Sequence, residues 1–272
     1  ALYPPSAAGI AAGGVTLTLT TNDPAGPCGP VSDQVRITIN AGAGANAGPD
    51  QTVCSSSPLV QLAGSIGGGA TSGFWSGGAG TFSPSRSDLN ATYMPSAAEI
   101  AAGTVTFSLT TNDPVGPCGA VSDAITIAIN PAAVVNAGAD RRVCASSPQV
   151  QLAGSLSGGA SSGTWSGGGG SFQPNASSPG ATYTPSAAEI AAGSVTLTLT
   201  SNDPAGPCGV VSDQMKITID PITVVNAGAD QTVCATSPAV QLGGSVSGTV
   251  SSGTWSGGGG TFSPSNTGLN AT

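Results

Sequence analysis

The six cysteines are the residues of this chain whose type and spacing could do chemistry, and that chemistry is disulfide formation. They form two series at intervals of 90 residues, Cys28, Cys118 and Cys208 in one and Cys54, Cys144 and Cys234 in the other. Zinc binding is the competing interpretation, but zinc favours clustered thiolates or histidines at short spacings, and the chain has no His and no Cys-x-x-Cys motif. The cysteines therefore indicate disulfides, which persist in oxidising, extracellular surroundings.

The pairing follows from where each cysteine stands relative to the expected strands. Cys54 ends the first strand of a repeat and Cys118 lies in the loop before the last strand, so both are expected at one end of a two-sheet sandwich. We therefore predict the disulfides Cys54–Cys118 and, one repeat later, Cys144–Cys208. Cys28 and Cys234 remain as candidates for bonds between units, with partners in further repeats of the chain or in a neighbouring molecule.

The strict interval of 90 residues means that one small folding unit is copied in tandem. The expected division gives complete repeats over 46–130 and 136–220, the C-terminal half of a repeat over 1–40, and the N-terminal half of one over 226–272. Trp75, Trp165 and Trp255 follow the same interval. One Trp per unit within a strand is what a single sandwich core uses, so we expect these three residues in cores rather than on a sugar-binding surface.

The composition excludes several classes of partner. Charged residues make up 7% of the chain, the net charge is −8 and the mean hydropathy is +0.18. An acidic chain without a basic patch is poorly suited to nucleic acid or to anionic membrane surfaces. The chain also lacks an apolar run of about 18 residues, the length that a membrane-spanning helix needs. We expect no nucleic-acid partner and no membrane insertion of this segment.

Short alternating runs predict an all-β fold. Residues 104–110 and 125–129 alternate apolar and hydroxylated or small side chains with the period of two of a half-buried strand. About seven such strands in roughly 85 residues, separated by Gly, Pro and Asn-Asp-Pro turns, are typical of an antiparallel two-sheet sandwich. One short helix is expected after Ser96, which forms a capping box with Glu99, and it ends at Gly103 with Ile100 in the core.

No catalytic, cofactor-binding or metal-ligating residue is predicted. Without His there is no histidine base, and the carboxylates are isolated Asp residues at turns. Asp113, Asp123 and Asp140 recur in every copy and could bind calcium or cap turns. Turn capping is favoured because no Asp-x-Asp cluster occurs. Outward Thr16, Thr18 and Thr20 could bind a surface glycan or ice, although Thr is also common on exposed strands.

Several segments together resemble the PKD-like or Ig-like tandem repeats of large secreted bacterial surface proteins of the gliding-motility-associated adhesin type. The resemblance rests on NAGAD at 136–140, VC at 143–144, GTWSG at 163–167 and ATYTPSAAEI at 181–190, and it covers essentially the whole chain. It implies Ig-like sandwiches exported to the cell surface, acting as spacers and adhesive stalks, and it implies no catalytic residues.

These observations favour a structural or adhesive segment of an extracellular filament or giant cell-surface adhesin. Its domains are expected to form an elongated rod, with neighbouring copies or continuing repeats of the same chain as head-to-tail partners. Two other functions stay open at this point: a glycan-binding spacer, which glycan-array binding would reveal, and the non-catalytic stalk of a secreted enzyme.

Overall fold

The computed structural model describes residues 2–22, 25–114, 116–204 and 206–272, and most of its regular structure is β-strand. The chain divides into two compact units, which are described separately. Unit 1 comprises Ala1–Pro131 together with Ala205–Cys208, and unit 2 comprises Ala132–Pro204 together with Gly209–Thr272.

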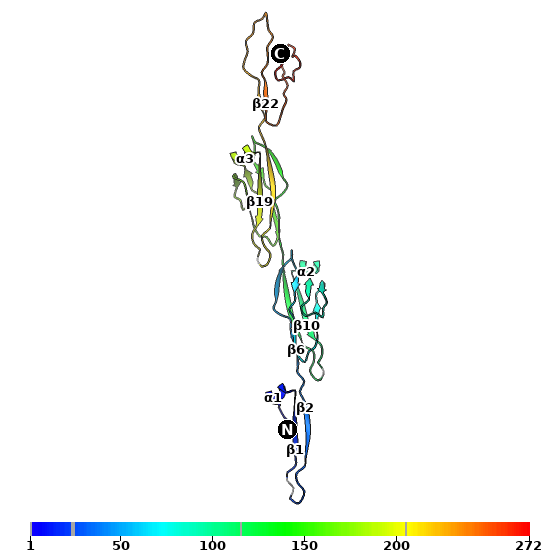
Figure 1. Cartoon of the computed structure of the whole chain (residues 1–272). Coiled ribbons are helices and arrows are strands. Elements are labelled where there is room, and N and C mark those ends of the chain that lie inside the picture. The colour runs from blue at the N-terminus through cyan, green and yellow to red at the C-terminus, as the bar shows by residue number, and fades with distance from the viewer. Residues whose placement is uncertain (1, 23–24, 115, 205) are drawn as a thin grey trace. The chain divides into compact units, whose positions relative to one another are not determined.

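Unit 1 contains a β-hairpin followed by one complete set of strands. The hairpin consists of β1 (Gly14–Thr20) and β2 (Ser32–Thr38), preceded by the short helix α1 (Ala7–Ala11) (Figure 1). The remaining elements are β3 (Ala43–Asn46), β4 (Gln51–Cys54), β5 (Val60–Gln61), β6 (Ser65–Gly68), β7 (Gly73–Gly77), β8 (Thr81–Ser83), β9 (Thr92–Met94), α2 (Ala97–Ala102), β10 (Thr104–Thr111) and β11 (Ser122–Asn130). They form a four-stranded sheet in the order β4-β11-β10-β7, a three-stranded sheet β5-β9-β8 and the pair β3-β6.

The core of this strand set follows the predicted alternation. Val105, Phe107 and Leu109 of β10 are buried, while the intervening residues of the strand are exposed or half-buried. Trp75 of β7 lies opposite Leu109 in the sheet, and Tyr93 of β9 packs edge-on against Phe107 with ring centroids 4.5 Å apart. The two sheets therefore close around one shared apolar core, as expected for a sandwich.

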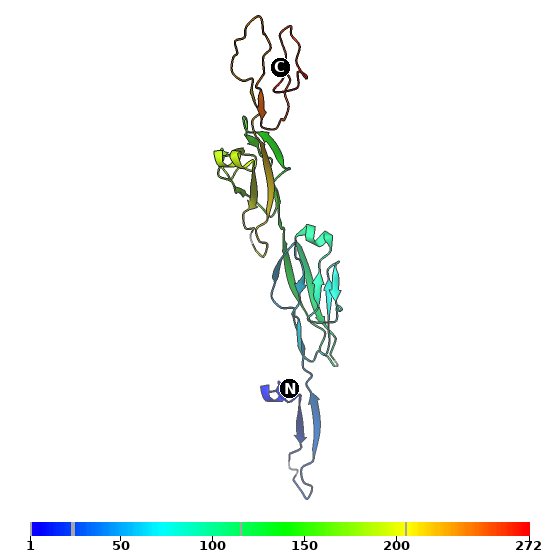
Figure 2. The same cartoon turned by 45° about the horizontal axis from the view of Figure 1, so that its top comes forward.

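The predicted helix and its caps are confirmed in α2. Ser96 and Glu99 form a reciprocal capping box, and Gly103 ends the helix in the left-handed conformation at φ +75°. Ile100 packs against the core as a half-buried residue. The helix joins β9 of one sheet to β10 of the other and lies at one end of the strands (Figure 2).

One strand pairing differs from the expected all-antiparallel sandwich. β4 pairs with β11 in parallel, with Gln51 opposite Ile127 and Cys54 opposite Asn130. Strands joined by a tight turn must be antiparallel, whereas the first and last strands of this set are separated by all the others. No turn constrains their relative direction, and the parallel arrangement places Cys54 at the C-terminal end of β11.

Unit 2 repeats this strand set and continues into a shorter segment. Its elements are β12 (Ala133–Asn136), β13 (Arg141–Cys144), β14 (Val150–Gln151), β15 (Ser155–Gly158), β16 (Gly163–Ser166), β17 (Ser171–Gln173), β18 (Thr182–Thr184), α3 (Ala187–Ala192), β19 (Ser194–Ser201), β20 (Ser212–Asp220), β21 (Val224–Asn226) and β22 (Ser245–Ser247). The sheets have the orders β13-β20-β19-β16, β14-β18-β17 and β12-β15, and β13 is again parallel to β20. β21 and β22 form a separate pair.

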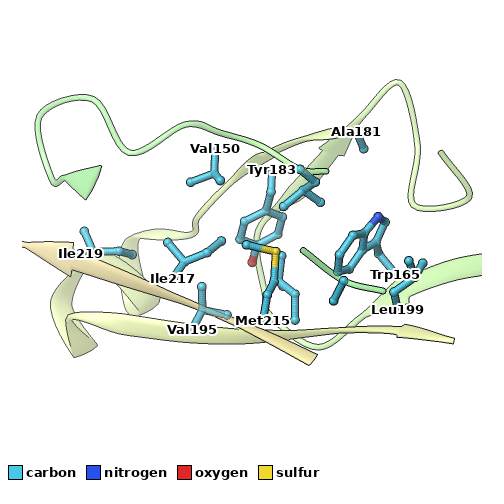
Figure 3. Packing of buried hydrophobic residues seen from close by; sticks show 12 residues of the cluster. Val150, Trp165, Ala181, Tyr183, Val195, Leu199, Met215, Ile217 and Ile219 are labelled. Atoms are coloured by element: carbon cyan, nitrogen blue, oxygen red, sulfur yellow. The ribbon is translucent and has the colours of Figure 1, made fainter. Parts of the chain in front are cut away.

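The core of unit 2 has the same design as that of unit 1. Trp165, Tyr183 and Met215 point into the space between the two sheets, with Ile217 and Leu199 beside them (Figure 3). All five are buried, Trp165 at 2% exposure and Tyr183 at 0%. The third tryptophan, Trp255, lies in the segment after β20 and is only half-buried. The three equivalent tryptophans therefore occupy two complete cores and one incomplete one.

Candidate functional site at the cysteines

Cys54 is held at the end of β4 by the backbone that follows the strand. The Ser55 amide donates to the Asn130 carbonyl at 2.8 Å, and the Ser57 amide closes a turn onto the Cys54 carbonyl at 2.9 Å. The Cys54 side chain is 6% exposed, and its sulfur lies 3.2 Å from the Ser56 hydroxyl. The parallel pairing with β11 thus directs Cys54 toward the last residue of that strand.

Cys208 reaches the same place from the loop before β20. Its Sγ lies 3.4 Å from the Asn130 carbonyl oxygen, and the side chain is 3% exposed. Gly206 has φ +91°, and a Cβ at this position would collide with the Asn130 side-chain amide. The loop can therefore approach Asn130 closely only with glycine there.

Cys54 and Cys208 form a disulfide across 154 residues of sequence, with their Cα atoms 5.1 Å apart. This separation lies within the range that disulfide geometry allows. Both cysteines belong to unit 1 by their contacts, although they lie in successive copies of the 90-residue sequence repeat. The bond therefore connects residues of two successive copies of the repeat.

This pairing corrects the expectation of Cys54–Cys118 and Cys144–Cys208. Cys54 lies opposite Asn130 at the C-terminal end of β11, whereas Cys118 precedes Ser122 at the N-terminal end of the same strand. At about 3.3 Å per residue, the length of β11 separates the two positions by roughly 26 Å. Disulfide-bonded Cα atoms lie within about 7 Å, so this pair cannot close.

Cys118 stands in the same surroundings as Cys208 but without a bonded partner. Its Sγ lies 3.6 Å from the Asn40 carbonyl oxygen, as Cys208 lies against Asn130. Gly116 has φ +113°, and a Cβ there would collide with the Asn40 amide, as at Gly206. The loop before the last strand thus approaches the equivalent asparagine in both copies.

The four remaining thiols differ in exposure. Among the described residues Cys28, Cys144 and Cys234 are free and exposed, and Cys118 is free and half-buried. The Cys144 sulfur lies 3.1 Å from the Ser146 hydroxyl, and hydrogen bonding from Ser146 lowers the pKa of this thiol. Thr236 lowers the pKa of the Cys234 thiol in the same way, at 3.0 Å. A lowered pKa increases the thiolate fraction, which is the form that reacts in disulfide exchange.

A second repeated cluster joins a tyrosine to the acid of the capping box. The Tyr93 hydroxyl donates to the Glu99 carboxylate at 2.7 Å and accepts from the Gly80 amide at 2.7 Å. The Ala79 and Ser96 amides also donate to Glu99, each at 2.8 Å. The cluster ties the turn after β7, strand β9 and the start of α2 together. Tyr183 and Glu189 repeat it in unit 2.

The protonation states in this cluster suit a structural lock. Burial and the hydrogen bond to Glu99 raise the pKa of Tyr93 to about 12. Burial and the hydrogen bond to Glu189 raise the pKa of Tyr183 to about 12. Burial opposes ionisation of Glu99, but the amide donors of Ala79 and Ser96 outweigh it and lower the pKa of this carboxyl group. At neutral pH a neutral phenol therefore donates to a carboxylate.

Two of the recurring aspartates, Asp123 and Asp140, bond to backbone far away in the sequence. Asp123 accepts the Ala47 amide at 2.8 Å, and Asp140 accepts the Lys216 amide at 2.8 Å, each across 76 residues. The sequence did not predict these long-range bonds. A local bond occurs as well at Asp33, the equivalent of Asp123, which accepts the Gln34 amide at 2.8 Å. Within the described ranges no group of three or more His, Cys, Asp or Glu side chains could hold a metal ion.

Two further features bear on possible partners. Thr16, Thr18 and Thr20 of β1 are exposed, as expected for outward positions of a strand. In the part of the chain that the structure describes, no helix combines the length and the apolar character needed to cross a membrane.

No family model matches the chain, and no curated protein matches it. Solved structures of cadherin domains do align with it. Protocadherin Gamma B2 extracellular cadherin domains 3–6 give 15% identity and a TM-score of 0.38 over 96% of this chain and 75% of that one. EC21-23 of human CDH23 gives 11% identity and a TM-score of 0.43 over 69% and 68%. Mouse clustered PcdhgC3 EC1-3 gives 12% and 0.40 over 76% and 77%. All three TM-scores lie below 0.5, so the description of the fold given above depends on the strands and cores of this chain and not on these likenesses.

Proposed function

We propose that this chain is a structural and adhesive segment of an extracellular filament or large cell-surface protein, built from tandem disulfide-linked sandwich domains of the Ig-like or PKD-like type. The observation that carries the proposal is the Cys54–Cys208 bond, which connects residues of two successive copies of one repeat. A bond of this kind adds no active site but covalently joins one copy to the next, which suits a chain under mechanical load.

The proposed extracellular location follows from the same bond. Disulfides persist where the surroundings are oxidising and are rare in the cytosol. In this proposal the two complete repeats are residues 46–130 and 136–220. Their cores contain 11 and 12 buried residues, respectively. Cores of this size belong to small domains, for which covalent links contribute a large share of stability.

Surface labelling of the cells that make this protein tests the proposal. Antibodies raised against the 272-residue chain should bind intact cells or extracellular filaments, and brief protease treatment of intact cells should release peptides of this chain. Labelling that appears only after the cells are permeabilised would contradict the proposed location. Turnover of a substrate by the purified chain would contradict the proposed role.

A further inference from the structure

The hairpin β1–β2 exposes the apolar face that its counterpart in the complete repeat buries. Leu19 is 80% exposed and Val35 is 58% exposed. Their equivalents one repeat later, Leu109 and Ile125, are 0% and 1% exposed. The two hairpins carry apolar side chains at equivalent positions. The difference in exposure therefore comes from the residues that pack against each hairpin. In the complete repeat the cover comes from residues 47–93, including Trp75.

Residues 226–272 correspond in sequence to the residues that bury Leu109 and Ile125 in the complete repeat. They keep the local backbone bonds of the complete repeats, since Leu242 donates to Ala271 at 2.8 Å as Leu62 donates to Ala91 at 3.0 Å. Val233, however, is 46% exposed and Trp255 is half-buried. The residues equivalent to β4 do not form a strand here, because a β4-type strand forms by pairing with the last strand of a repeat.

We infer that residues 226–272 of one copy dock onto residues 1–40 of a second copy and complete one sandwich. The register follows from the observed pairing of β4 with β11. Because Cys54 lies opposite Asn130, Cys234 of the first copy is placed opposite Asn40 of the second. Leu19 and Val35 of the second copy would then meet Trp255 and Leu242 of the first, as their equivalents meet in unit 1.

The same register specifies two disulfides between the copies. Cys118 of the second copy already lies 3.6 Å from its own Asn40 carbonyl, the position that Cys208 occupies beside Asn130. Cys234 of the first copy would arrive there as Cys54 does, which gives the bond Cys234–Cys118. Cys144 lies opposite Asp220, the residue equivalent to Asn130, so the loop with Cys28 of the second copy would bring the bond Cys144–Cys28. When the second copy is counted three repeats of 90 residues after the first, both bonds span the same 154 positions as Cys54–Cys208.

The reaction is ordinary thiol–disulfide exchange and needs a disulfide oxidant. A thiolate of one copy attacks an oxidant such as oxidised glutathione and forms a mixed disulfide, with one reduced glutathione leaving. The thiol of the second copy then displaces the second glutathione. For each bond formed, two protein thiols lose two electrons and two protons, and one oxidised glutathione becomes two reduced ones.

This inference deepens the proposed structural role, but its test is independent of cell-surface location. The purified 272-residue chain is oxidised in glutathione buffer, separated under non-reducing conditions and digested for mass spectrometry. We expect a ladder of multimers that contains the peptide pairs Cys144–Cys28 and Cys234–Cys118, together with Cys54–Cys208 within each copy. Monomers alone, or a ladder joined by Cys28–Cys234, would overturn it.

Two complementary double variants test the direction of assembly. Cys28→Ser with Cys118→Ser leaves only the C-terminal thiols, and Cys144→Ser with Cys234→Ser leaves only the N-terminal ones. Each variant alone should stay monomeric on a denaturing gel, and the mixture should stop at a covalent dimer. Retention of the Cys54–Cys208 peptide in both variants shows that they fold. Multimers from either variant alone would refute the pairing.

Docking of the apolar faces is tested apart from the bonds. Leu19→Asp changes a side chain that is exposed in the single copy but would be buried in the completed sandwich. We expect at least a tenfold loss of multimers at equal concentration. Thr16→Asp is the matched control, because its equivalents Thr106 and Thr196 are exposed in the complete repeats. Equal ladders from both variants would overturn the docking.

Discussion

Breaking the Cys54–Cys208 bond should lengthen the fully stretched chain by one large, defined step. The bond encloses 154 residue steps, which cannot extend while it is intact. An extended chain spans about 3.3–3.6 Å per residue, so the release amounts to roughly 51–55 nm. The sulfurs are buried in the folded protein, with Cys54 at 6% and Cys208 at 3% exposure, so reduction should follow mechanical unfolding.

Single-molecule force spectroscopy measures this step directly. The chain is held by its two ends, unfolded under oxidising conditions and then exposed to a thiol reductant at constant force. Cys54→Ser should extend fully without the reductant-dependent step, while Cys118→Ser, the matched control, should keep it. The bonds Cys54–Cys118 and Cys144–Cys208 would instead give two steps of 64 residues each, roughly 21–23 nm apiece. Two such steps, or loss of the large step in Cys118→Ser, would refute the observed pairing.

Three further outcomes are expected. Tyr93→Phe should lower the free energy of unfolding of its repeat by roughly 2–4 kcal/mol in denaturant titrations, because Glu99 loses a donor and the half-buried Gly80 amide loses its acceptor. Tyr3→Phe is the control and should cost less than about 0.5 kcal/mol, because Gly9 stands there in place of the glutamate and Tyr3 is 45% exposed. Stability supplied by the protonated Tyr93 phenol is complete below its ordinary pKa of 10.0 and should fall as pH rises toward its folded pKa of about 12, so thermal scans that show constant stability from pH 9 to 12 would contradict the Tyr–Glu lock. Leu109→Ala should destabilise the core of unit 1 by about 2–5 kcal/mol through the cavity it leaves, as measured by the denaturant midpoint, and an unchanged midpoint would show that Leu109 is not packed as described.

Several local features follow from the sequence because short-range chemistry decides them. The alternation at Val105, Phe107 and Leu109 assigns the buried face of β10, since side chains on a strand point to opposite sides in turn. The capping box of Ser96 and Glu99 fixes the start of α2, because its donors and acceptors lie within three residues of each other. Neither depends on distant parts of the chain.

The partner of Cys54 could not be found in the same way. A strictly periodic sequence offers an equivalent cysteine 64 residues on, at Cys118, and another 154 residues on, at Cys208. Both pairings are consistent with the residue types and spacings around the cysteines. The parallel direction of β4 against β11 makes the choice, because it places Cys54 at Asn130, the residue that Cys208 contacts.

The sequence by itself determined the repeat, the strands that alternate and the capped helix, because each is set by residue type and by spacing over a few positions. The tertiary structure decided which cysteines bond and which backbone amides the aspartates Asp123 and Asp140 bind. These are contacts between residues 76 or more positions apart, and only the direction and register of paired strands bring such residues together.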